Sequence, residues 1–294
     1  MGDGALIVPL ELACQCLFII GPAKSGTTVL LDALNDSRMV YLLNEPDLHN
    51  DPGTPGFAAR FNAHYAEWAS QLTKGHFCPD FFEGAGSWAD NLTRLSRCHH
   101  LVGTKIVTRP ISSPDQINMI MQFHTINFYE SNYIFSFRSP EAVITSSHYF
   151  QRSFDTDISP MEDVIYNFAK TVSMFITMRR IFPKVRVVFH HSMNTAIFAE
   201  LSAELGVDLS RAGTYYEERR IKNHEPLVLS EEQSKILELA SEIFDELVAL
   251  AAEDFPQLQR AQNYFAPDPN TATRLGLLAQ RCDYLVRTLA RVER

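Results

Sequence analysis

Residues 21–28 combine two glycines, several hydroxyl side chains and one lysine, in the order Gly-Pro-Ala-Lys-Ser-Gly-Thr-Thr. They lie between a short apolar run, residues 17–20, and a segment with helical apolar spacing, residues 27–34. Backbone N–H groups in such a turn, together with those that begin the following helix, form an anion-binding site. The sequence therefore predicts a phosphate-binding loop in which Lys24 and the hydroxyl groups are additional donors.

This loop differs from the nucleotide-binding loop of P-loop kinases. Gly21 and Gly26 have the spacing of the glycines in the Walker A pattern, in which a lysine follows the second glycine. Thr27 stands at that lysine position, and the lysine of this chain lies earlier, at Lys24. A kinase with this change would lose its contact with the β- and γ-phosphates. A P-loop kinase or related nucleotide-binding protein is therefore an alternative interpretation of this loop.

A second set of phosphate-binding side chains follows another apolar run, residues 133–137. Arg138 comes directly after this predicted strand, and Ser146 follows eight residues later. An arginine at a strand end can grip a phosphate through two parallel hydrogen bonds. Ser146 lies two helical turns further along and faces the same side, so that its hydroxyl can donate to the same group.

Together the two motifs resemble those of sulfotransferases that use 3′-phosphoadenylyl sulfate (PAPS), closest in pattern to bacterial and carbohydrate or heparan-type members. The resemblance spans most of residues 15–255 and implies that the 5′-phosphosulfate is bound by Ala23, Lys24, Ser25, Gly26, Thr27 and Thr28. It implies a 3′-phosphate site at Arg138 and Ser146. A looser match of residues 219–226 to the cofactor-covering loop of these enzymes adds Arg220, Lys222 and Asn223.

Transfer of a sulfuryl group to a hydroxyl requires a base and cations that neutralise the leaving phosphate. Residues 103–107 lack the histidine base that phenol and steroid sulfotransferases carry on the corresponding strand. The resemblance to heparan-type enzymes instead implies Glu45 as the base and Lys105 as an electrostatic or acceptor-orienting group. His49 is the next candidate base, and no metal ion is required.

Apolar runs alternate with helical stretches along the chain. The predicted strands cover residues 17–20, 101–107, 133–137 and 185–189, and the predicted helices cover residues 27–34, 114–123, 140–150 and 160–182. This alternation predicts an α/β fold with a central, mainly parallel sheet. We expect a P-loop-like fold of three layers, with helices on both faces of the sheet and a helical C-terminal extension.

We expect one sulfotransferase domain, residues 1–260, followed by the helical extension, residues 261–294. Residues 44–96 are rich in Gly, Pro, Asn, His and aromatic side chains and predict an insertion that forms the acceptor pocket. In the extension, apolar side chains recur at steps of three and four residues. This stripe either docks on its own domain or forms a homodimer seam, and it comprises Leu275, Leu278, Cys282, Leu285, Leu289 and Val292.

The composition restricts the partners and the compartment. The 294 residues include 26 basic and 35 acidic ones, a net charge of −9, which argues against binding to nucleic acid or to an anionic membrane. The five cysteines form no metal-binding pattern, and polar residues and a proline interrupt the apolar stretch 5–20. We therefore expect a cytoplasmic protein with reduced thiols and no membrane anchor.

The sequence thus predicts a PAPS-dependent sulfotransferase that acts on a hydroxyl of a small metabolite or carbohydrate and releases 3′,5′-adenosine diphosphate. A catalytically inactive protein that binds adenine nucleotides is a further alternative, because it would keep both phosphate-binding motifs and would not need Glu45. The acceptor itself is not defined, because its pocket is expected in the least patterned part of the chain.

Overall fold

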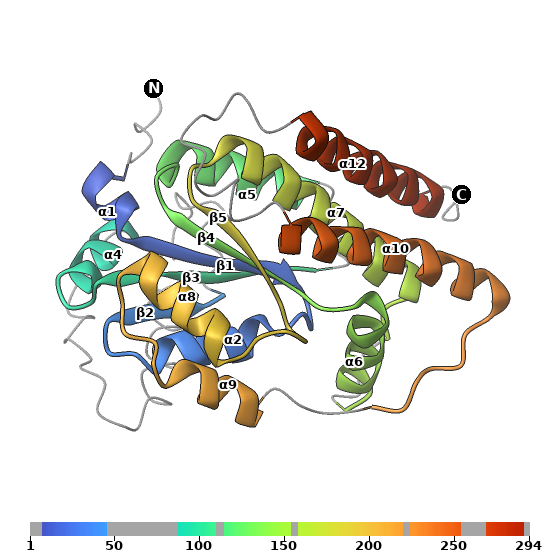
Figure 1. Cartoon of the computed structure of the whole chain (residues 1–294), viewed down its shortest axis with the longest axis horizontal. Coiled ribbons are helices and arrows are strands. Elements are labelled where there is room, and N and C mark those ends of the chain that lie inside the picture. The colour runs from blue at the N-terminus through green and yellow to red at the C-terminus, as the bar shows by residue number, and fades with distance from the viewer. Residues whose placement is uncertain are drawn as a thin grey trace.

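The computed structural model describes residues 8–45, 88–109, 115–153, 158–219, 224–253 and 269–290. Five strands in these ranges form one sheet, in which every pairing is parallel and the order is β2-β3-β1-β4-β5 (Figure 1). The predicted α/β class is confirmed. The strands are β1 (Cys16–Pro22), β2 (Val40–Asn44), β3 (Leu101–Thr108), β4 (Asn132–Phe137) and β5 (Val185–Phe189).

The sheet is the middle of three layers. Strand β1 is buried along its whole length, and its alternate side chains belong to two separate apolar clusters, as expected for a parallel strand covered on both faces. Leu17 and Ile19 pack in the cluster with α2 (Thr27–Asn35), α8 (Thr195–Leu205) and α9 (Ala212–Arg219). Phe18 and Ile20 belong to the other cluster, whose helices include α5 (Asp115–Asn127), α7 (Met161–Ile181), α10 (Glu231–Glu253) and α12 (Pro269–Ala290).

The order of the strands reverses direction at β1 and β4. Helix α2 leads from β1 to β2 on one side, whereas α6 (Pro140–Ser153) and α7 lead from β4 to β5 on the other. The chain therefore leaves the neighbouring strands β1 and β4 in opposite directions, and α/β proteins bind ligands at such a point. Both predicted phosphate-binding segments begin there.

The predicted strands and helices are present, with ends shifted by a few residues. Strand β2, α1 (Leu10–Cys14), α8 and α9 were not predicted, and α4 (Trp88–Ser96) falls inside the predicted insertion. Strand β2 has only five residues and lies at the edge of the sheet. A local tether holds it there, because the Asn35 side chain accepts from the Leu42 N–H and donates to the Leu42 carbonyl.

The C-terminal stripe is buried within the chain. Helix α12 packs against α7 and α10, and the stripe residues from Leu275 to Leu289 are at most 5% exposed. This is the first of the two predicted alternatives, docking on the chain's own domain. Val292 lies outside the described residues. A homodimer stays a prediction, and it would require a different face of α12.

No helix in the described residues is long and apolar enough to cross a membrane. The same ranges contain no group of three or more His, Cys, Asp or Glu side chains arranged to hold a metal ion.

Candidate active site at the carboxyl edge of the sheet

The loop between β1 and α2 makes a tight turn. Lys24 has a φ of 68° and Gly26 a φ of 90°, both in the left-handed region. A side chain on Gly26 would collide with the imidazole ring of His190, which follows β5. Glycine is therefore required at this position both for its φ and for the close approach of His190.

The loop presents hydrogen-bond donors that no described residue accepts. The N–H groups of Gly26, Thr27 and Thr28 at the start of α2 have no acceptor in the described part of the chain, as is usual for a first helical turn. The Ser25 hydroxyl is fully buried and has no hydrogen-bond partner there either. An unpaired buried hydroxyl is costly unless a ligand satisfies it, so these donors favour an anion site.

Not every predicted loop donor is available. The Ala23 N–H donates to the carbonyl of Thr108 at 3.0 Å, and the Ser25 N–H donates to the carbonyl of Pro22 at 3.1 Å. The first bond ties the turn to the end of β3, and the second closes the turn itself. The predicted contact of Ala23 with a ligand would therefore have to involve another atom, and it stays a prediction.

Lys24 extends from the loop toward α6. Its Nζ lies 2.8 Å from the ring centroid of Phe150. Burial and the nearby Lys105 charge together lower the pKa of Lys24 to about 8, against the opposite effect of Glu45. The ammonium is thus positively charged near neutral pH, and it is the loop's only cationic side chain between Gly21 and Thr28.

Arg138 reaches the same edge from β4. The Ser136 hydroxyl donates to the Ser25 carbonyl at 3.1 Å, which ties the end of β4 to the loop two residues before Arg138. Within the described residues the half-buried Arg138 guanidinium has no hydrogen bond or ion pair, and its burial lowers its pKa, opposed by Tyr216. A cation held out of water without a partner is unfavourable, which favours an anionic ligand there.

Helix α6 brings the predicted Ser146 to this edge as well. Ser146 lies one helical turn before Phe150, so both residues project from the same side of α6. Because Phe150 contacts Lys24, that side of α6 faces the loop. The loop after β1, the end of β4 and one side of α6 are therefore adjacent, and the assignment of two phosphate sites to them stays a prediction.

Glu45 and Lys105 form one ionic cluster with the loop. The Lys105 side chain is only 2% exposed, and its Nζ lies 2.8 Å from Glu45 Oε1 and donates to Thr28 Oγ1 at 2.8 Å. The register explains this contact, because Asn44 at the end of β2 pairs with Lys105 on β3. Arg109, just beyond β3, donates to Glu45 Oε2 at 2.6 Å.

This cluster sets the charge of Glu45. Burial by itself would raise the pKa of the carboxyl, but the charges and hydrogen bonds of Lys105 and Arg109 outweigh it and hold that pKa below its usual range. Glu45 is thus ionised at neutral pH and can accept a proton. A lower pKa also makes a carboxylate a weaker base, so contact with Lys105 and Arg109 reduces the strength of Glu45 as a base.

Four residues of this site were not predicted from the sequence. Arg109 and His190 directly follow the strands β3 and β5, and Phe150 lies one turn after Ser146. Asp32 lies one turn after Thr28 on α2, and burial raises the pKa of its carboxyl, opposed by Lys105 and Arg219. A survey of polar residues at strand ends would have found the first two, because ligands bind at that edge.

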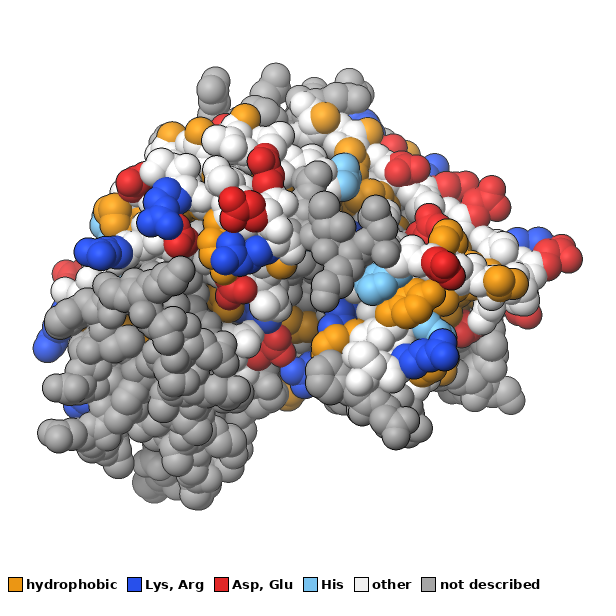
Figure 2. All heavy atoms as spheres, turned by 90° about the horizontal axis from the view of Figure 1, so that it is seen from below, with side chains coloured by type: hydrophobic (Ala, Val, Ile, Leu, Met, Phe, Trp, Pro, Cys, Tyr) orange, Lys and Arg blue, Asp and Glu red, His pale blue; other side chains and the backbone are white. Residues whose placement is uncertain are grey.

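The predicted Arg220, Lys222 and Asn223 lie outside the described residues, as do His49 and residues 46–87 of the predicted insertion. Their assignments to the cofactor and to the acceptor pocket stay predictions. Figure 2 shows the molecule from below the view of Figure 1, where basic, acidic, histidine and apolar side chains are interspersed.

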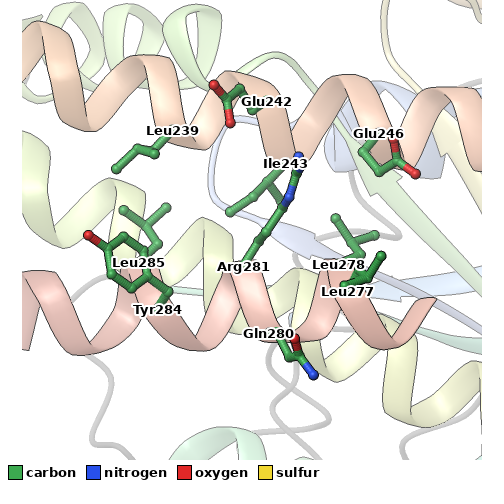
Figure 3. A pocket seen from close by; sticks show the side chains of 10 residues that line it. All are labelled: Leu239, Glu242, Ile243, Glu246, Leu277, Leu278, Gln280, Arg281, Tyr284 and Leu285. Atoms are coloured by element: carbon green, nitrogen blue, oxygen red, sulfur yellow. The ribbon is translucent and has the colours of Figure 1, made fainter. Parts of the chain in front are cut away.

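A hollow of about 450 Å³ lies elsewhere, between α10 and α12 (Figure 3). Apolar side chains from both helices line it, including Leu239, Ile243, Leu278 and Leu285, with Glu242 and Arg281 among the charged ones. It includes no residue of the loop or of the strand ends. It is therefore not part of the candidate site.

Fold and site together define an α/β protein with a tight, donor-rich turn after its first strand. No protein-family model matches the chain, and no curated protein matches it. Among solved structures, the chain is similar to the sulfotransferase domain from the Synechococcus PCC 7002 olefin synthase. The two are 16% identical with a TM-score of 0.47, over 78% of this chain and 94% of that one.

Proposed function

We propose that this protein is a PAPS-dependent sulfotransferase that acts on a hydroxyl of a small metabolite or carbohydrate. The observation that carries the proposal is the placement of two half-buried cations, Lys24 and Arg138, on loops from neighbouring strands that the Ser136–Ser25 hydrogen bond joins. A nucleotide with phosphate groups at both its 5′ and 3′ positions needs two such sites. Both motifs also resemble those of PAPS-dependent enzymes.

The donors at this edge suit the two anionic ends of PAPS. The loop N–H groups from Gly26 to Thr28, the buried Ser25 hydroxyl and Lys24 would hold the 5′-phosphosulfate. Arg138 and Ser146 would hold the 3′-phosphate. When bound, PAPS supplies an activated sulfuryl group, and 3′,5′-adenosine diphosphate is the product that leaves.

The chain's own residues have distinct tasks in this proposal. Glu45 takes the proton of the acceptor hydroxyl, while Lys105 holds the carboxylate next to Thr28 at the start of α2. Lys24 offsets the negative charge that grows on the leaving phosphate oxygen. Fixed charges of this kind stabilise a transition state because they need no rearrangement when the charge develops.

One observation favours a second candidate, a catalytically inactive protein that binds adenine nucleotides. Both oxygens of Glu45 contact cations, at 2.8 Å for Lys105 and 2.6 Å for Arg109. Such a carboxylate could simply hold the loop together. The two candidates bind the same nucleotide and differ in turnover.

Calorimetry with 3′,5′-adenosine diphosphate, with and without magnesium, tests the nucleotide site. We expect binding that does not need magnesium and is much weaker for 5′-AMP. Sulfur-labelled PAPS incubated with the protein and fractionated metabolites tests turnover, read by mass spectrometry as a gain of one sulfate. Binding without any labelled product would support the inactive protein, and a lack of binding would refute both candidates.

We also propose a cytoplasmic location. The cysteines Cys14, Cys16, Cys98 and Cys282 are free thiols, which supports a reducing compartment. Localisation of a tagged full-length chain by microscopy or fractionation is the direct measurement.

A further inference from the structure

Phe150 is an aromatic side chain whose position the apolar core does not explain. It lies on α6 and is 47% exposed, whereas the core-facing side chains of the same helix, such as Val143 and Ile144, are at most 5% exposed. Its ring instead contacts the Lys24 ammonium, with Nζ 2.8 Å from the ring centroid. A lysine over an aromatic face is attracted by the ring quadrupole.

The surroundings of Lys24 otherwise disfavour its charge. The side chain is half-buried, and Lys105 on β3 adds a repulsive positive charge. Glu45, beyond β2, is the attractive charge that opposes this repulsion, but its two oxygens already contact Lys105 and Arg109. The Phe150 ring is therefore a neutral group that stabilises the ammonium without occupying the place of an anionic ligand.

The contact also restricts a flexible side chain. A lysine ammonium has three N–H donors on a four-carbon stem, and it is otherwise free to move among many rotamers. One N–H directed at the ring leaves two for other acceptors. Because Phe150 and Ser146 project from the same side of α6, the ring holds Nζ on the side of the helix that also presents Ser146.

We propose that Phe150 is a positioning residue for Lys24. Its ring holds the ammonium at the mouth of the phosphate-binding loop and favours its charged form, so that two N–H donors already point toward the incoming anion. This inference rests on the function proposed above in that the anion is taken to be the 5′-phosphosulfate of PAPS or the 5′-phosphate of 3′,5′-adenosine diphosphate.

The variant Phe150→Leu keeps an apolar side chain of similar reach and removes the ring face. Because residue 150 is half-exposed, we expect this variant to fold. A cation–aromatic contact at an accessible site is worth a factor of about two to five in the protonation equilibrium, so the pKa of Lys24 should fall by about half a pH unit. Phe150→Tyr should restore it, since tyrosine also offers a ring face.

Tyr149 supplies a matched control on the same helix. Its ring stacks on His224, with centroids 4.7 Å apart, and Lys24 is not part of that contact. Tyr149→Leu removes an aromatic ring from α6 without touching the ammonium. It should leave the Lys24 signal and its titration unchanged.

Nuclear magnetic resonance of the full chain with ¹³C-methylated lysines tests the contact without any ligand. In the unsubstituted protein the Lys24 methyl signal, assigned with Lys24→Met, should be shifted upfield by the ring. The shift should vanish in Phe150→Leu and persist in Phe150→Tyr and Tyr149→Leu. A Lys24 signal without an upfield shift in the unsubstituted protein would overturn the proposal.

Binding of 3′,5′-adenosine diphosphate from pH 6.5 to 9.5 (about 1.5 pH units either side of pH 8) then tests the positioning role. Affinity should fall as Lys24 loses its proton, and in Phe150→Leu this fall should come about half a pH unit lower. Identical profiles for the two proteins would overturn the proposal. An upfield Lys24 signal in a protein that binds no 3′,5′-adenosine diphosphate at any pH would instead refute the proposed function and leave the contact established.

Discussion

The ammonium of Lys105 lies 2.8 Å from Glu45 Oε1 and donates to the hydroxyl of Thr28 at the same distance. One buried cation thus joins three segments, the end of β2, the middle of β3 and the start of α2. Glu45 and Lys105 therefore act as one unit. Removal of Lys105 should therefore alter the pKa of Glu45, and removal of the Glu45 charge takes away the ion-pair partner of Lys105.

The first prediction concerns Glu45→Gln, which keeps the shape of the side chain and removes its capacity as a base. Turnover should fall by about 10²–10⁴-fold, the usual contribution of a general base. Affinity for 3′,5′-adenosine diphosphate, measured by calorimetry, should stay within about twofold, because the phosphate-binding donors are unchanged. Glu200→Gln, a surface acid that pairs with Arg186, is the control. Near-normal turnover would remove Glu45 from the mechanism.

The second prediction uses the pH dependence of Lys105→Met. Lys105 helps to hold the Glu45 pKa below its usual range, so its removal should raise that pKa. The rate of a reaction that needs ionised Glu45 falls as pH drops through this pKa, so the acid limb of the pH–rate profile should move to higher pH. The loss of a charge-assisted hydrogen bond, about 1.5–3 kcal/mol, should also lower turnover by roughly 10- to 100-fold.

Lys184→Met is the control for that experiment. Lys184 donates to the Glu130 carbonyl on the exposed side of the molecule and has no contact with the candidate site. An acid limb that stays in place in Lys105→Met would mean that Glu45 is not the group titrating.

The third prediction concerns Arg138→Ala. A charge-assisted contact with a 3′-phosphate is worth about 1.5–3 kcal/mol, so affinity for 3′,5′-adenosine diphosphate should fall by roughly 10- to 100-fold. Affinity for 5′-AMP, which has no 3′-phosphate, should barely change. Arg152→Ala, an exposed arginine on α6, should alter neither ligand. Equal losses for the two nucleotides in calorimetry would place Arg138 elsewhere.

The fourth prediction separates binding from catalysis at Lys24. Its charge should matter more as the leaving phosphate becomes negative than in the ground state, so Lys24→Met should reduce kcat more than it weakens nucleotide binding. Steady-state kinetics beside calorimetry gives both quantities. A loss confined to binding would make Lys24 an anchor and would direct attention to Lys105 for the leaving group.

The fifth prediction concerns the stability of the loop. Gly26→Ala places a side chain at a φ of 90° and against the His190 ring. The left-handed conformation alone costs roughly 1–2 kcal/mol, so the melting temperature should fall and nucleotide binding should weaken. Gly276→Ala on α12 meets nothing within 4 Å and should be neutral or stabilise by up to about 1 kcal/mol, since alanine favours a helix. Equal melting temperatures for the two variants would contradict this account.

The sequence determined the α/β class and the position of the donor-rich turn after β1, because both depend on local patterns. A strand buried on two faces is apolar throughout, and a turn between such a strand and a helix has the same donors whatever surrounds it. The C-terminal stripe was also predictable from its periodicity, but the spacing fits a helix packed on its own domain as well as one in a dimer. Burial against α7 and α10 distinguished the two.

The contacts between distant residues were decided by the tertiary structure alone. Glu45 meets Lys105 because β2 lies beside β3 in a register that pairs Asn44 with Lys105, and neither the order nor the register of strands is encoded within one segment. Likewise, Lys24 lies over Phe150 only because α6 returns to the loop after β4. The sequence thus determined which groups could carry charge and donate hydrogen bonds. The packing of separate elements decided which of them share a site, and therefore which are ionised, restrained or free to meet a ligand.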